Sequence, residues 1–237
     1  MHTDKKQNEY LPGTLFVVAT PIGNLGDITM RALEVLRLAD LVLCEDTRVT
    51  RKLLSAYDIS AKTMRYDAHS TVGDNAKILA MLEEGKYVAL VSDAGTPSIS
   101  DPGVHLVRQI RDLTSCDIHV VPIPGASAFV TALSASGVPA SEFLFLGFLP
   151  HKKGRETLFR EIAETERAVV FYESTHRIEK AVASLGEHIG SRTITIAREL
   201  TKHFEEIYEG TADEILAGFS AKPERLKGEF VVIVHGK

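Results

Sequence analysis

The sequence lacks the features of several large protein classes. Its two cysteines, Cys44 and Cys116, lie in apolar surroundings without paired spacing, so we expect reduced thiols and a cytoplasmic protein rather than a disulfide framework. No apolar run approaches the roughly 20 residues that a membrane-spanning helix needs. The N-terminal MHTDKKQNEY lacks the apolar core of a signal peptide. We therefore expect a soluble protein with no membrane association and a flexible tail over residues 1–11.

Several motifs that would identify a cofactor or a metal are also missing. No GxGxxG follows the first apolar run and no Ser or Thr follows the terminal Gly-Lys, which excludes a dinucleotide fingerprint and a P-loop. HExxH, CxxC and GxSxG are absent, so nothing supports a metal site or a serine hydrolase. A basic excess is absent as well, because the net charge is −5. Any contact with nucleic acid must therefore depend on local basic patches.

What the chain does contain is a regular alternation of apolar runs and helical patterns. The 237 residues, 44 % of them hydrophobic, suffice for one large or two small domains. The alternation predicts an α/β protein with a mostly parallel sheet and helices in an N-terminal lobe, residues 12–138. A hinge near Val138 would lead to a C-terminal α/β lobe, residues 139–237, with a mixed sheet. We expect strands at 15–20, 41–44, 88–91, 118–121, 143–148, 168–172, 193–197, 205–208 and 230–234.

Helix boundaries are predicted from capping residues. Asp27 is a plausible N-cap for a helix that ends near Ala39, and Asp101-Pro102 resembles an N-cap followed by proline at the first helical position. Further helices are expected at 49–57, 75–84 and 127–135, with Gly85 following the second of these. Thr211-Ala-Asp-Glu214 has the pattern of a capping box.

Polar loops that contain glycine, proline or charged residues follow several predicted strands. They cover residues 20–25, 44–48, 92–96, 124–127 and 171–174. Each loop alone is more often an ordinary connection. In a parallel sheet, however, the carboxyl ends of the strands share one edge, so the first four loops would meet there. Their convergence predicts a binding site for a small ligand.

Seven segments in order carry a resemblance to a known family: ATPIGNLGDIT, CEDTRVTRKLL, VSDAGTPSISDPG, PIPGASA, FLGFLPHKKGRE, FYESTHR and ARELTKHFEE. They resemble the ribosomal RNA small-subunit methyltransferase I family of the tetrapyrrole methylase superfamily. The resemblance implies 2′-O-methylation of a cytidine in the decoding region of 16S rRNA, with S-adenosylmethionine as donor. It also implies a two-lobed fold with the donor between the lobes, a homodimer, the small ribosomal subunit as partner, and no metal. We expect longer members to carry a further C-terminal segment.

The resemblance also implies which residues hold the donor. The loop that contains Gly95, Thr96 and Ile99 would hold its methionine and ribose parts, while Tyr172 and Leu200 would pack on the adenine. Asp93, or the pair Glu45-Asp46, could offset the positive charge of the sulfonium. The complete set of expected cofactor-binding residues is Pro21, Ile22, Asp93, Ala94, Gly95, Thr96, Ile99, Ser127, Ala128, Tyr172 and Leu200.

Candidate catalytic residues lie in the CEDTR segment. The 2′-hydroxyl is a poor acid, so Glu45 or Asp46 would assist as a base, with Arg48 orienting a phosphate. The alternative is that Glu45, Asp46 and Arg48 cap the next helix and pair with each other, because capping carboxylates are common.

Local basic clusters support a contact with RNA. Phosphate binding is predicted for Arg51, Lys152, Lys153, Arg155 and Arg177. The alternative for each is a solvated charged face. Two other functions also stay open: methylation of a tetrapyrrole intermediate, whose carboxylates the basic loops would bind, and a non-catalytic nucleotide-binding module in ribosome assembly.

Overall fold

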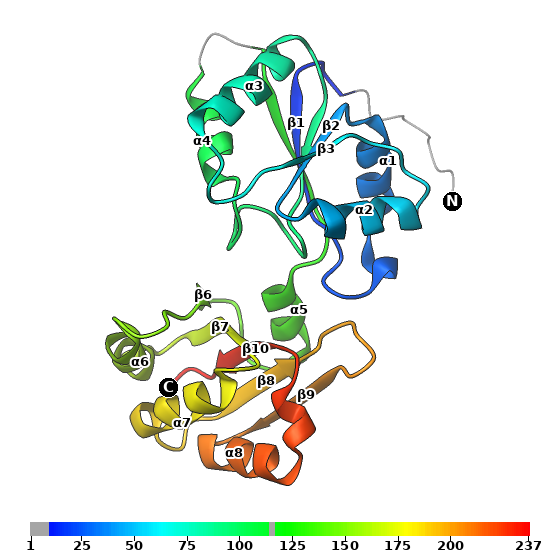
Figure 1. The fold of residues 1–237 in the computed structure, drawn as a ribbon. Coiled ribbons are helices and arrows are strands. Elements are labelled where there is room, and N and C mark those ends of the chain that lie inside the picture. Colours follow the sequence, from blue (N-terminus) through cyan, green and yellow to red (C-terminus); the bar gives the residue numbers. More distant parts are fainter. Residues whose placement is uncertain (1–9, 114–116) are drawn as a thin grey trace. The chain divides into compact units, whose positions relative to one another are not determined.

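The computed structural model describes residues 10–113 and 117–237, which form two compact units (Figure 1). The first unit runs from the start of the described chain to Pro21 and from Leu25 to Ala126. The second unit comprises Ile22–Asn24 and Ser127–Lys237. Most of the tail predicted over residues 1–11, and Cys116, lie outside the described residues. The other cysteine, Cys44, is a buried free thiol.

Within the described chain, the first unit is built on a parallel five-stranded sheet. Its strands are β1 (Thr14–Val18), β2 (Leu41–Cys44), β3 (Thr63–Arg65), β4 (Val88–Leu90) and β5 (His119–Ile123), in the order β3-β2-β4-β1-β5. Every pairing among them is parallel, as predicted. The short β3 was not predicted. β5 continues through Pro122, which was expected to end it, because an edge strand tolerates a proline.

Four helices of the described chain cover both faces of this sheet. α1 (Met30–Leu38) and α2 (Thr47–Ala56) lie on one face, and α3 (Val72–Glu83) and α4 (Val104–Asp112) lie on the other (Figure 1). Alternate strand residues serve the two faces: Phe16 and Val42 pack in the cluster with α1 and α2, whereas Leu15 and Leu43 pack in the cluster with α3 and α4. Burial on both faces explains why these strands are continuously apolar in the sequence.

Two predicted helix caps are wrong, and α3 begins three residues before the predicted start at residue 75. Asp27 ends a short 3₁₀ turn, η1 (Leu25–Asp27), and Thr29 caps α1 by accepting a hydrogen bond from the backbone N–H of Ala32 at 3.1 Å. Asp101 does not cap α4, which begins after Gly103, a residue with φ of +127°. In both places the chain makes a further turn before the helix begins, and the local sequence pattern did not reveal it.

Within the described residues, the second unit contains a mixed five-stranded sheet, as predicted. β6 (Phe143–Phe148), β7 (Ala168–Ser174), β8 (Ile194–Arg198), β9 (Glu206–Gly210) and β10 (Glu229–Val234) follow the order β6-β7-β10-β8-β9. β6 and β7 are parallel, and the other pairs are antiparallel. α6 (Arg155–Glu164), α7 (Ile178–Ile189) and α8 (Ala212–Ala221) contribute Phe159, Leu185 and Phe219 to its core. A 3₁₀ turn, η2 (Pro223–Leu226), precedes β10.

α5 (Ala128–Ala135), which the sequence analysis placed in the first lobe, packs against β7 and β10 of the second unit. The units therefore divide between Ala126 and Ser127, earlier than the boundary predicted at residue 138. The predicted capping box at α8 is confirmed, because Thr211 and Glu214 each bond the backbone N–H of the other. No helix among the described residues is long and apolar enough to cross a membrane.

Candidate functional site

The loops that follow β1, β4 and β5 are joined by hydrogen bonds at the carboxyl edge of the parallel sheet. Thr20 and Gly95 exchange two backbone hydrogen bonds, at 2.9 and 3.0 Å. The hydroxyl of Ser92 donates to the carbonyl of Gly95, and the hydroxyl of Thr96 donates to the carbonyl of Ala126 at 3.1 Å. These bonds confirm that the loops gather at one edge, since they connect segments far apart in the sequence.

The loop after β2 joins the same group. The backbone N–H of Asp46 donates to the Asp93 carboxylate, which follows β4, at 3.0 Å. Beside this contact is a pocket of about 410 Å³ at the carboxyl ends of β2, β3 and β4. Its lining residues are Glu45, Asp46, Thr47, Arg48, Arg65, Asp67 and Asp93. All three predicted catalytic residues therefore line one pocket of the first unit.

Two ion pairs inside this pocket neutralise two of its four carboxylates. Arg48 pairs with Asp46 at 2.6 Å, and Arg65 pairs with Asp67 at 2.7 Å. The Arg48–Asp46 contact includes both carboxylate oxygens. The pocket then has two further carboxylates, those of Glu45 and Asp93, and its lining includes no third arginine or lysine. An excess of negative charge is therefore concentrated around Glu45.

The contacts of Asp46 and Arg48 are those expected if the two residues cap α2 and pair with each other. Asp46 is the N-cap of α2, where its side chain accepts a hydrogen bond from the backbone N–H of Arg48 at 2.8 Å. Hydrogen bonds from Arg48 keep the pKa of Asp46 far below its ordinary value. Asp46 therefore stays ionised and is a very weak base. Its observed contacts orient the start of α2.

Glu45 has a different environment. It is half-buried, and burial, followed by repulsion from Asp101 and Asp93, raises the pKa of its carboxyl from 4.5 to about 7. A carboxyl with such a pKa can exchange a proton near neutral pH. Asp101, which was predicted only as a helix cap, thus helps to raise the pKa of Glu45. Its pKa is also raised by burial.

Sequence reasoning did not identify Arg65 and Asp67 as part of this pocket. Arg65 is the last residue of β3, and Asp67 lies two residues after it. β3 has only three residues and lies in a segment without clear periodicity. The available signal was the alternation of charges in the stretch Arg-Tyr-Asp, where the intervening Tyr66 is buried. Charged residues around a buried aromatic indicate a strand end that is partly covered.

The residues predicted to hold the donor are divided between the two units. Pro21, Asp93, Ala94, Gly95, Thr96 and Ile99 belong to the first unit, and Ile22, Ser127, Ala128, Tyr172 and Leu200 belong to the second. In the first unit, the residues from Asp93 to Ile99 lie in the loop after β4 that pairs with Thr20, and Pro21 directly follows Thr20. Gly95 has φ of +83°, a conformation that residues with a side chain rarely adopt. In the second unit, Ser127 is the N-cap of α5 and makes no capping hydrogen bond with its side chain.

Leu200 lies in a strained turn between β8 and β9. Its neighbours Glu199 and Thr201 have φ of +50° and +66°, although neither is a glycine. The turn is anchored by Arg198, whose guanidinium donates to the carbonyls of Phe204, Glu224 and Lys227. Strain of this kind persists only where the surroundings hold it, and it is concentrated at functional sites. Leu200 itself is buried.

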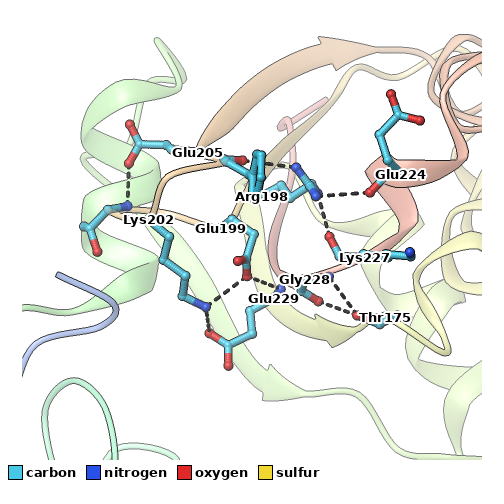
Figure 2. A network of polar contacts seen from close by, with 11 residues as sticks. Thr175, Arg198, Glu199, Lys202, Glu205, Glu224, Lys227, Gly228 and Glu229 are labelled. Carbon is cyan, nitrogen blue, oxygen red and sulfur yellow. Dashed lines mark hydrogen bonds and ion pairs between the residues drawn. The ribbon is translucent and has the colours of Figure 1, made fainter.

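Lys202 stabilises the same turn through two ion pairs. Its ammonium group bonds the carboxylates of Glu199 and Glu229 at 2.9 and 2.8 Å (Figure 2). A Cβ on Gly23 would lie 2.5 Å from Cγ of Lys202, so the segment Ile22–Asn24 packs closely on this turn. The predicted donor residues Ile22 and Leu200 therefore belong to one packed region of the second unit.

The predicted RNA-binding residues differ in their availability. Arg51, Lys152 and Lys153 are exposed. Arg155 and Arg177, in contrast, have side chains that are only 12 % and 19 % exposed, and both pair with the buried carboxylate of Glu173. Much of their charge is thus already neutralised. Among the described residues, no group of three or more His, Cys, Asp and Glu side chains could hold a metal ion.

Comparison with solved structures supports the fold. Uroporphyrin-III-C-methyltransferase from Thermus thermophilus superposes with a TM-score of 0.62 at 19 % sequence identity, covering 94 % of both chains. The methyltransferase CobJ gives a TM-score of 0.68 at 21 % identity, again over 94 % of both chains. At such identities the likeness concerns the fold alone.

Sequence relatives carry more specific information. Proteins named ribosomal RNA small subunit methyltransferase I are 49 % identical in Escherichia coli O157:H7 and 40 % identical in Bacillus subtilis. Each match covers 94 % of this chain, and 78 % and 75 % of the two relatives. The family described as Tetrapyrrole (Corrin/Porphyrin) Methylases matches residues 14–216. The chain is therefore a methyltransferase that belongs to the ribosomal RNA small subunit methyltransferase I family, within the tetrapyrrole methylases.

Proposed function

We propose that this protein transfers a methyl group from S-adenosylmethionine to the 2′-hydroxyl of a cytidine in the decoding region of 16S rRNA. The observation that carries the proposal is the half-buried Glu45, with a pKa of about 7, in a pocket at the carboxyl edge of the sheet. The names of the relatives support ribosomal RNA of the small subunit as the substrate class.

Glu45 acts as the general base in this proposal. Its carboxylate takes the proton of the 2′-hydroxyl as the ribose oxygen bonds the methyl carbon, while the bond from that carbon to the sulfonium sulfur breaks and its electron pair stays on the sulfur of S-adenosylhomocysteine. A base whose pKa lies near the working pH contributes about 10²- to 10⁴-fold to such a reaction. Asp46 and Arg48 hold the adjacent start of α2, and Asp93 binds the backbone of Asp46. These contacts keep the Glu45 backbone in place.

The residues of the first unit fit the chemistry of the donor. S-adenosylmethionine supplies a methyl group on a positively charged sulfonium, and the surplus carboxylates of Glu45 and Asp93 favour a cation. The loop from Asp93 to Thr96 has small residues at Ala94 and Gly95, so its backbone is accessible to a ligand. In the second unit, the partly exposed Tyr172 packs on the adenine in this proposal, together with the turn that contains the buried Leu200.

Exposed basic residues bind the RNA in this proposal. Lys152 and Lys153 contact phosphates from the loop after β6, and Arg51 does so from α2. Because the net charge is −5, general attraction to RNA is weak, and the shape of the assembled small subunit contributes to recognition. We place this activity in the cytoplasm, with a homodimer as the active form.

Transfer of label tests the proposal directly. Purified small subunits are incubated with the protein and radiolabelled S-adenosylmethionine, and the modified nucleotide is mapped by mass spectrometry. We expect one 2′-O-methylated cytidine in the decoding region. Label on another nucleotide would contradict the assigned site. Label on a porphyrinoid, but none on rRNA, would favour a tetrapyrrole methylase, and no transfer at all would favour a non-catalytic assembly module.

A further inference from the structure

A buried carboxylate near the end of β7, that of Glu173, contacts two arginines. One is the first residue of α6, and the other is the N-cap of α7. The side chain of Glu173 has no exposed surface. Its Oε2 accepts a hydrogen bond from Arg155, the first residue of α6, at 2.9 Å. Its Oε1 forms an ion pair with Nε of Arg177, the N-cap of α7, at 2.8 Å. The backbone N–H of Ser174 donates to the same Oε1 at 2.8 Å. Both oxygens of this carboxylate are therefore paired.

Both arginines extend the network to the loop after β6. Arg177 donates to the carbonyl of Leu149 at 3.1 Å, and Arg155 donates to the carbonyl of Pro150 at 3.3 Å. These two consecutive carbonyls begin the segment that carries Lys152 and Lys153. Glu173 is thus connected, through two arginines, to the base of an exposed basic loop.

The far end of the basic loop and the turn after β7 are also constrained. Gly154 ends the loop in a left-handed conformation, with φ of +86°, and α6 begins directly after it. In the turn after β7, the hydroxyl of Thr175 donates to the carbonyl of Gly228 at 2.7 Å and accepts from its N–H at 2.9 Å (Figure 2). Arg177 therefore projects from a turn whose position is set by β10 and the segment before it.

The charges of this cluster contribute little to stability, which leaves positioning as their role. A buried ion pair gains little over apolar side chains of similar volume, because the desolvation of the charges offsets their attraction. Two of the guanidinium hydrogen bonds go to backbone carbonyls of the loop rather than to the carboxylate. What the charged cluster provides, and an apolar core would not, is a defined path for the segment between Leu149 and Gly154.

We propose that Glu173 is a positioning residue for RNA binding: by holding Arg155 and Arg177, it sets the loop from which Lys152 and Lys153 contact phosphate. This inference rests on the proposed rRNA substrate. Two lysines on a preorganised loop lose less conformational entropy on binding than two on a free loop. Loss of the Glu173 charge therefore weakens substrate binding without touching the donor or Glu45.

The test compares Glu173→Gln with the wild-type protein in steady-state transfer to small subunits. We expect KM for the subunit to rise about tenfold, equivalent to about 1.4 kcal/mol, while kcat and the affinity for S-adenosylmethionine change less than about twofold. Hydrogen exchange of the backbone amides of residues 151–154 should become faster. Glu179→Gln, the same substitution at an exposed position of α7, is the matched control and should leave all four quantities unchanged.

A double-mutant cycle separates positioning from general destabilisation. In a Lys152→Ala, Lys153→Ala background, Glu173→Gln should raise KM no further, because the residues that it positions are gone. An equal rise in both backgrounds, or an unchanged KM in a folded variant, would overturn the inference. If Glu173→Gln does not fold, Arg177→Lys replaces it, since lysine keeps the charge but lacks the planar guanidinium through which Arg177 reaches Glu173 and Leu149 with two different nitrogens. Wild-type protein that fails to methylate rRNA would instead refute the proposed function.

Discussion

Replacing Glu45 by glutamine should separate activity from stability. Glutamine has nearly the same shape but cannot accept the proton, so the single-turnover rate of methyl transfer should fall by about 10²- to 10⁴-fold. In the wild-type protein the rate should rise about tenfold per pH unit below pH 7 and level off above it, because only the ionised carboxyl is a base. In Glu45→Gln this dependence should disappear.

The same substitution should stabilise the protein above pH 7. The pKa of Glu45 is higher in the folded state, about 7, than its ordinary value of 4.5. The stability that the protonated carboxyl contributes is therefore complete below about pH 4.5 and is lost as the pH rises to 7. This pKa difference limits the stability that Glu45 loses above pH 7 to about 3 kcal/mol. Because the side chain is only half-buried, solvent screening reduces the expected gain in Glu45→Gln at pH 8 to about 1 kcal/mol.

Urea unfolding at pH 5 and pH 8, together with single-turnover rates from pH 5.5 to 8.5, measures both effects. Asp46→Asn is the matched control: it removes charge from the neighbouring helix cap, so we expect lower stability but an unchanged midpoint of the pH–rate profile. A wild-type rate and pH profile in Glu45→Gln would exclude Glu45 as the general base. Equal stability changes at the two pH values would show that the Glu45 pKa is not raised.

Three further predictions concern the loops and the basic surface. Thr96→Arg should weaken binding of S-adenosylmethionine more than about 100-fold in calorimetry, with an unchanged circular dichroism spectrum; normal affinity would exclude this loop as the donor site. Lys152→Glu with Lys153→Glu should reduce the salt dependence of subunit binding, and an unaltered slope would exclude that patch. Gly103→Ala should lower the free energy of unfolding by about 2 kcal/mol, because its Cβ would lie 2.6 Å from Leu90 at φ of +127°; an unchanged urea midpoint would contradict this.

Local sequence patterns predicted most of the elements correctly but placed some of their ends wrongly. Apolar runs identified β2, β6 and β10 with errors of at most one residue, because burial on a sheet requires such runs. The starts of α1 and α4 were misplaced, because several nearby residues could serve as caps and the path of the preceding loop decides between them. The sequence of α5 does not show to which unit the helix belongs, because an apolar helix can pack against either sheet.

The order of the strands and helices, apart from the short β3, follows from the sequence alone. So does the gathering of the loops, because parallel strands place all their carboxyl ends at one edge. Seven ordered segments also identify the family. The pairing of the charged groups, in contrast, follows from the tertiary structure. The raised pKa of Glu45 depends on burial and on Asp93 and Asp101, and the burial of Glu173 depends on arginines from two helices. Such properties arise from distances between residues remote in the chain, which no local pattern encodes.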